Sequence, residues 1–275
     1  MTARTTRSHN LALSVGLTLA YAVFALFSLT LTREGAGIAT VWLAGGVLAQ
    51  AFLLLPWRWS LGVLIACCLV QLAYNLMIGN PPLIAFTFPL LTCAEAFATA
   101  WLARKVCGKT MRLTSLTRVA RLLLLAVAPA IAAGAVIAAD IFTIYGRSFD
   151  VVLTNWFYGH ALGMAIVLPA GLMILRPDMS RDFRRPAAEQ VAIYGFIAAM
   201  SVLAFAPVRF PLTLFLFPAL TFAAFRLGPR GAAVGALIVA VIMPALIVAL
   251  PVVRHQETWT FAEKVRSMQF LIALA

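Results

Sequence analysis

The chain contains few charged residues and very few acidic ones. Only 11% of its 275 residues are Asp, Glu, Lys or Arg, and Asp and Glu together number nine. A soluble domain is about one quarter charged, so this scarcity excludes an ordinary water-soluble fold. The hydrophobic share of 63% and the mean hydropathy of +0.99 indicate an integral membrane domain, whose first partner is the lipid bilayer.

Motifs for catalysis, cofactors and metals are also missing. The sequence has no G-x-S-x-G, H-E-x-x-H, C-x-x-C or G-x-G-x-x-G. Gly108-Lys109-Thr110 resembles the end of a phosphate-binding loop, but Ala103 stands where the first glycine is required. The four cysteines match no metal or redox spacing, and no ligand-spaced His or acid accompanies His160. We therefore expect no catalytic residue, no cofactor and no metal in this segment.

The net charge of +12 comes from Lys and Arg gathered in five blocks between apolar runs. Basic residues after every second run indicate cytoplasmic loops that face anionic lipid headgroups. No basic stripe is interleaved with aromatics, so nucleic-acid binding is not expected. A cytoplasmic N-terminus places 15 of the 21 basic residues inside. The blocks are residues 4–7, 58, 104–121, 176–185 and 226–230.

Ten apolar segments are candidates to cross a bilayer, which takes about 20 residues. They predict an all-α, polytopic transmembrane helical bundle of about eight to ten spans, forming a single domain over residues 1–275. The first segment is too long for a signal peptide and has no A-x-A cleavage site, so we expect it to be retained. The segments are residues 10–31, 38–55, 61–78, 83–102, 122–139, 156–175, 190–206, 212–225, 231–250 and one that begins near residue 265.

The seventh and eighth segments are short and flank Pro207-Val208-Arg209, so they allow a broken or re-entrant pair. If they are two passes, the last segment runs inward. We then expect the chain to continue into the cytoplasm beyond Ala275, where an output domain would lie.

Polar residues within the apolar segments are the candidates for function. Glu95 shares a helix face with Thr92 and Thr99, and a carboxylate in hydrocarbon marks either a functional site or a structural acid with a buried partner. Gln71 and Asn75 share a face of another segment, where they line a ligand pocket or join helices by hydrogen bonds.

Two further groups of residues bear on function or packing. Trp156 and His160 are four residues apart, and a histidine there is a pH or ligand sensor or a structural residue. Small residues at G-x-x-x-G spacing allow helices to approach closely. The glycines concerned are Gly45, Gly159, Gly163, Gly231 and Gly235.

Several segments, in order, resemble the first family of membrane-associated sensor (MASE) domains. Residues 41–46, VWLAGG, are similar to the family's Trp-x-x-x-Gly signature, and Gly62, Asn75 and Glu95 continue the series. The family's further motifs resemble residues 156–169, WFYGHALGMAIVLP, residues 222–231, FAAFRLGPRG, and residues 266–270, RSMQF. This chain has His160 where the family often has an acid, and Phe222 where it often has Trp.

The resemblance implies a multi-pass sensory domain of the bacterial inner membrane. Such domains typically precede cytoplasmic output modules, such as diguanylate cyclases, phosphodiesterases or histidine kinases. It implies that this segment is not itself an enzyme, whereas the full-length protein is one, most simply a diguanylate cyclase that acts in cyclic di-GMP signalling. A homodimer through the full-length protein is expected.

We therefore expect a signal-input domain that binds an unidentified ligand or membrane partner. The expected ligand-binding residues are Trp42, Gln71, Asn75, Glu95, Trp156 and His160. A secondary transporter of a small solute is an alternative, because several spans contain proline, although no repeat between the two halves is evident. A membrane scaffold that dimerises through its G-x-x-x-G faces is a second alternative.

Overall fold

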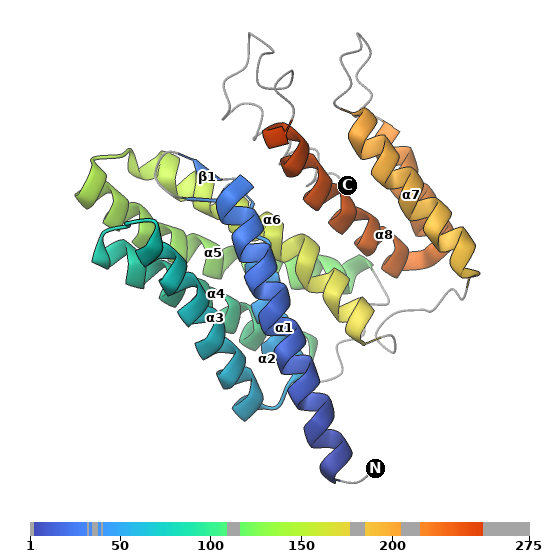
Figure 1. Ribbon diagram of the computed structural model, residues 1–275, viewed down its shortest axis with the longest axis horizontal. Coiled ribbons are helices and arrows are strands. Elements are labelled where there is room, and N and C mark those ends of the chain that lie inside the picture. The colour runs from blue at the N-terminus through green and yellow to red at the C-terminus, as the bar shows by residue number, and fades with distance from the viewer. Residues whose placement is uncertain are drawn as a thin grey trace. The chain divides into compact units, whose positions relative to one another are not determined.

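The computed structural model describes residues 3–31, 33–34, 38–39, 41–108, 116–176, 185–204 and 215–249. Within them it has eight helices, which confirms the predicted all-α bundle (Figure 1). Six helices are long and apolar enough to cross a membrane, and α2 and α7 are shorter. The helices are α1 Ala3–Leu31, α2 Ala44–Leu54, α3 Trp57–Met77, α4 Pro82–Cys107, α5 Leu116–Tyr145, α6 Phe149–Leu175, α7 Ala187–Leu203 and α8 Leu216–Ala249.

The chain folds into two compact units. The first contains α1 to α5 and α6 up to Leu168, and the second contains the end of α6 with α7 and α8. In the first unit α1 packs on α2 and α3, α3 packs on α4, and α4 packs on α5. A two-residue antiparallel pair, β1 Arg33–Glu34 with β2 Ile38–Ala39, follows α1.

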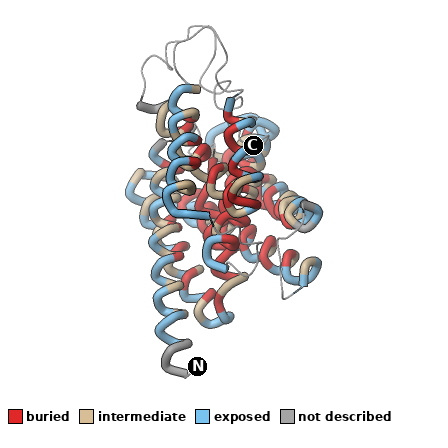
Figure 2. The backbone as a smooth tube through the Cα atoms, turned by 90° about the vertical axis from the view of Figure 1, so that its right-hand side faces the viewer, coloured by how far each residue is buried: buried red, intermediate tan, exposed pale blue. Residues whose placement is uncertain are grey.

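Helix α1 shows why an apolar sequence of this kind needs a bilayer. One face is buried against the protein, including Leu17, Tyr21 and Ala25, which are four residues apart. The opposite face is apolar as well but lies exposed along the helix that starts at the N-terminus (Figure 2). That face matches lipid rather than water. It carries Leu11, Val15, Leu19, Val23 and Leu26.

The second predicted span, residues 38–55, is not one continuous helix. Helix α2 starts only at Ala44 and has 11 residues, a length of about 16 Å, half of a bilayer's hydrocarbon thickness. Residues 38–39 form β2, and Val41, Trp42 and Leu43 are buried non-helical residues that lead into α2. Every residue from Ala44 to Phe52 is buried, so α2 is a central core helix of the first unit.

The end of α2 lies beside the end of α4. The Arg104 guanidinium donates a hydrogen bond to the carbonyl oxygen of Phe52, in the last turn of α2, where a cation complements the helix dipole. Trp57 and Phe97 pack on Phe52 with ring centroids 6.3 and 5.3 Å away. Aromatic and basic side chains at one level are typical of a membrane interface, and the sequence predicts this end to be cytoplasmic.

In the second unit, α7 and the first part of α8 form an antiparallel hairpin. Helix α8 breaks at Gly228, which has φ 72° and ψ −167°, a conformation that side chains disfavour. The first part of α8 ends there, between the eighth and ninth predicted spans. Arg226, beside this break, donates a 2.8 Å hydrogen bond to Glu189 in the first turn of α7. The start of α7 and the break in α8 are therefore at the same end of the pair.

This hairpin bears on the seventh and eighth predicted segments, residues 190–206 and 212–225. Two consecutive segments run in opposite directions when the start of the first lies beside the end of the second, as in two passes or a re-entrant pair. The connection around Arg209 and the tenth predicted span both lie outside the described residues.

We expect the turn before α6 and the start of α7 to face opposite sides of the membrane. In a variant whose native cysteines are replaced, Ser148→Cys should react with a membrane-impermeant maleimide in intact spheroplasts. Ala187→Cys should react only in inverted vesicles, because the basic residues near Ala187 favour the cytoplasm. Both positions are exposed, so either cysteine can react once the reagent reaches its side of the membrane. Equal labelling of both variants in spheroplasts would contradict the predicted orientation.

Candidate functional site

A buried acid–histidine pair joins α4 to α6. Glu95 Oε2 lies 2.8 Å from His160 Nδ1, and the two residues are only 3% and 4% exposed. An ionisable group at this depth is expensive unless it has a partner, and each of these residues provides one for the other. Sequence reasoning selected both residues separately, and the fold brings them together.

Two tryptophans from the predicted set stack on the imidazole of His160. The Trp156 ring, one turn earlier on α6, has its centroid 3.8 Å away and an interplanar angle of 20°. The Trp42 ring lies 5.7 Å away at 15°. Both indoles are 2% exposed. The imidazole therefore has a carboxylate at one nitrogen and two indole rings stacked nearly parallel to its plane.

Trp42 reaches His160 because the non-helical segment before α2 pairs with the backbone of α6. The Trp42 N–H donates a 3.0 Å hydrogen bond to the carbonyl oxygen of Gly159. A Cβ added to Gly163 would lie 1.9 Å from the Trp42 carbonyl oxygen. Only a glycine at this position allows the two backbones to approach so closely.

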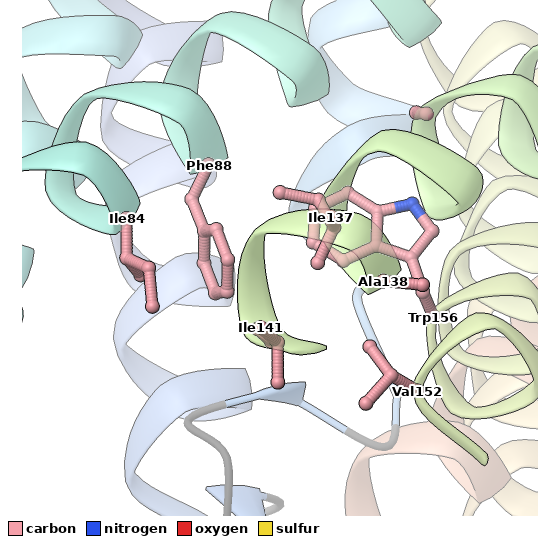
Figure 3. Packing of buried hydrophobic residues seen from close by; sticks show 8 residues of the cluster. Ile84, Phe88, Ile137, Ala138, Ile141, Val152 and Trp156 are labelled. Carbon is pink, nitrogen blue, oxygen red and sulfur yellow. The ribbon is translucent and has the colours of Figure 1, made fainter. Parts of the chain in front are cut away.

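Trp156 is held on its other side by an apolar cluster of α4, α5 and α6 (Figure 3). The Phe88 ring meets the indole edge-on, with centroids 5.5 Å apart. A Cβ added to Gly134 would lie 3.0 Å from Trp156 Cδ1. The close packing fixes the ring that stacks on His160. The cluster consists of Ile84, Phe88, Ala133, Ile137, Ala138, Ile141, Val152 and Trp156.

Gln71 and Asn75 belong to a hydrogen-bond chain that lies behind Trp42. The Tyr21 hydroxyl donates to Gln71 Oε1 at 2.7 Å, and Tyr21 meets the Trp42 ring edge-on at 6.5 Å. Asn75 donates to the Gln71 carbonyl at 2.8 Å and accepts from Asn80 at 2.6 Å. These bonds connect α1 with α3 and the turn after it. The Glu95–His160 pair is linked to them by Trp42, which stacks on His160 and meets Tyr21 edge-on.

Tyr21 and Gln50 are site-supporting residues that sequence reasoning missed. Gln50 Nε2 donates a 2.6 Å hydrogen bond to the Val167 carbonyl of α6, and beside it Gly46 leaves no room for a Cβ against Val167. Their location in the sequence could have identified them, since a tyrosine and a glutamine in the middle of apolar segments need internal partners.

Four buried polar atoms around the pair have no hydrogen-bond partner within the described part of the chain. They are Trp42 Nε1, Trp156 Nε1, Thr92 Oγ1 and Thr99 Oγ1. Thr92 and Thr99 lie one turn to either side of Glu95 on the same face of α4. An unpaired polar atom costs free energy in an apolar interior, so these four atoms mark a place suited to water or a polar ligand.

The remaining predicted packing glycines are covered by this chain's own atoms. A Cβ on Gly231 would lie 2.3 Å from Leu227 Cβ, and one on Gly235 would lie 2.9 Å from the side chains of Ile197 and Leu220. Gly45 lies against Trp42, 3.3 Å from its Cδ1.

The fold and these contacts define a class of protein, namely a multi-pass helical membrane domain with a polar site buried in its interior. The sequence profile of the MASE1 family matches residues 11–273. The chain therefore belongs to the MASE1 family of membrane sensory domains, as the ordered motifs predicted. No curated protein and no solved structure matches the chain.

We expect Gly163→Ala to destabilise the domain strongly. The added methyl group would overlap the Trp42 carbonyl, which is backbone, and the Trp42 amide is held by its hydrogen bond to the Gly159 carbonyl. The cost should therefore reach about 3 kcal/mol, the upper range for overpacking. Thermal unfolding in detergent, followed by circular dichroism, measures it. Gly62→Ala is the matched control, because a Cβ there meets nothing within 4 Å. Equal melting temperatures for the two variants would contradict this packing.

Proposed function

We propose that this domain is the signal-input region of a larger protein of the bacterial inner membrane. It binds a ligand at the site around Glu95 and His160 and regulates a C-terminal cytoplasmic output module of the diguanylate cyclase class. Membership of the MASE1 family supports the sensory role. The bias of basic residues supports a cytoplasmic N-terminus, and the antiparallel α7–α8 hairpin agrees with an inward exit after the last predicted span.

The observation that carries the ligand site is the buried Glu95–His160 pair with its stacked tryptophans. Two ionisable side chains at membrane depth are a functional site by default. They join α4 to α6 directly, and through Trp42 they meet the segment that leads into α2. A ligand that favours one arrangement of these contacts shifts the positions of three elements at once, which is what coupling to a distant output requires.

Removing either member of the pair should change the output. We expect Glu95→Gln and His160→Gln, in the full-length protein, to alter cellular cyclic di-GMP by about fivefold or more, the lower end of ordinary allosteric coupling. Both substitutions keep the approximate size of the side chain but remove its ionisable group. The nucleotide is measured by mass spectrometry of cell extracts at equal expression of each variant.

Matched controls come from the same residue types outside the site. Asp150→Asn removes an exposed acid at the start of α6, and His9→Gln removes an exposed histidine of α1. Neither should change the output. Wild-type output in both site variants at normal membrane levels would sink the proposal.

The class of the output module has its own test. Translating the gene beyond codon 275 should show a GGDEF signature of a diguanylate cyclase, or the signature of a histidine kinase as the other output of this type. A stop codon soon after that position would remove the output module and favour transport.

Transport is the second candidate function, and one observation favours it. Helix α2 is a half-length helix that follows buried non-helical backbone, and transporters place broken helices of this kind at their substrate sites. Uptake of a radiolabelled solute by proteoliposomes of the isolated protein would support this alternative. Because every residue from Ala44 to Phe52 is buried, α2 has a structural role as well.

A further inference from the structure

The arrangement around His160 leads us to infer that the ligand of this site is the proton. We propose that His160 takes up a proton at Nε2, and that this protonation is the input signal of the domain. The inference rests on the proposed function and names its ligand. In the reaction one N–H bond forms as a hydronium ion gives up a proton and becomes water, no bond in the protein breaks, and the charge of the Glu95–His160 pair changes from −1 to 0.

Two flat aromatic rings and a carboxylate are the usual means by which proteins hold an organic cation. Here Trp42, Trp156 and Glu95 supply these parts, and the group among them is the protein's own imidazole. The arrangement therefore stabilises the imidazolium form, through its stacking on the indoles and through the charge-assisted bond to Glu95.

Burial acts in the same direction. With Glu95 ionised, the neutral imidazole donates its Nδ1 hydrogen to the carboxylate and leaves one net negative charge in an apolar interior. A proton on Nε2 makes the pair neutral overall, and a neutral pair is much less costly to bury than a lone charge. The nearest basic residue along α4, Arg104, is bound to the Phe52 carbonyl instead.

The unpaired hydroxyls of α4 place further polar groups on the helix face that carries Glu95. Elsewhere in the described helices, the hydroxyls of Ser14, Thr18 and Ser201 each bond to the carbonyl one turn earlier. Thr92 and Thr99 have no such partner, although they are almost fully buried. Hydroxyls left free on the face of Glu95 are suited to ordered water, and chains of acids, histidines and water conduct protons in membrane proteins.

Other titratable groups lie on the elements that pack around the pair. Glu95 faces His160 from α4, and Trp42 and Trp156 present their indoles to it. Tyr21 of α1 lies behind Trp42 and is hydrogen-bonded to α3. Asp140 belongs to α5, where Ile137 and Ile141 pack with Trp156. The buried thiols of this unit are Cys67 on α3 and Cys93 on α4.

The stacked tryptophans report the proton directly, because an imidazolium quenches the fluorescence of an indole that it touches. The intact protein in lipid nanodiscs is titrated from pH 8.5 to pH 4.5. The domain's tryptophan emission should fall by up to about one third, since two of its six tryptophans stack on His160. Trp156→Phe should remove more of this change than Trp42→Phe, because its ring is the closer one.

His160→Gln should abolish the change in emission, whereas His9→Gln, an exposed histidine, should preserve it. Cyclic di-GMP output should depend on external pH in the wild type and not in His160→Gln. A pH change in emission that survives His160→Gln, or a flat wild-type titration in nanodiscs, overturns proton binding. If the Trp156→Phe protein, with His160 intact, keeps the full change, the assignment to this site is wrong.

A further outcome separates this inference from the function on which it rests. If the output responds to Glu95→Gln and His160→Gln but not to pH in the wild type, the site regulates the output and the proton is not its ligand. If neither variant alters the output, the proposed function itself has failed.

Discussion

Inside a bilayer no water is available to pair with polar groups, and this constraint governs most of the contacts described above. Every buried donor or acceptor needs a partner within the protein. The Trp42 amide finds the Gly159 carbonyl, Gln50 finds a carbonyl of α6, and Tyr21 finds Gln71. These bonds fix the positions of α1, α2, α3 and α6 relative to one another within the first unit, where apolar contacts alone would allow the helices to slide in lipid.

Because buried polar groups need partners, the ones without partners are informative about function. Apolar side chains such as Phe88 and Ile137 enclose Trp156, so the low dielectric around the Glu95–His160 pair strengthens its attraction. The same environment penalises every polar atom that remains unpaired. Four of the six such side-chain atoms in the described part of the chain lie around this one ionisable pair, and this concentration connects the packing of the domain to its sensory role.

Local signals in the sequence were sufficient for the helices but not for the contacts among them. Turn residues such as Gly228 interrupt the apolar runs, so the ends of most spans were predicted to within about seven residues. The short α2 was not predicted, because the Trp42 amide is held by a distant carbonyl that no local pattern reveals. Glu95 and His160 were selected by their cost in hydrocarbon, yet periodicity describes one helix at a time and does not pair residues on two helices. Tyr21 was missed because its role depends on a third helix.

The half-length α2 also constrains how the protein is made. Residues 38–55 are apolar enough to enter the membrane while the chain is being synthesised, and in lipid a helix is the form that satisfies their backbone. The partner of the Trp42 amide belongs to α6, which is synthesised much later. The second segment therefore cannot take its final form until α6 has been inserted, so assembly of the site is a late event in biogenesis, and a chain interrupted before α6 lacks it.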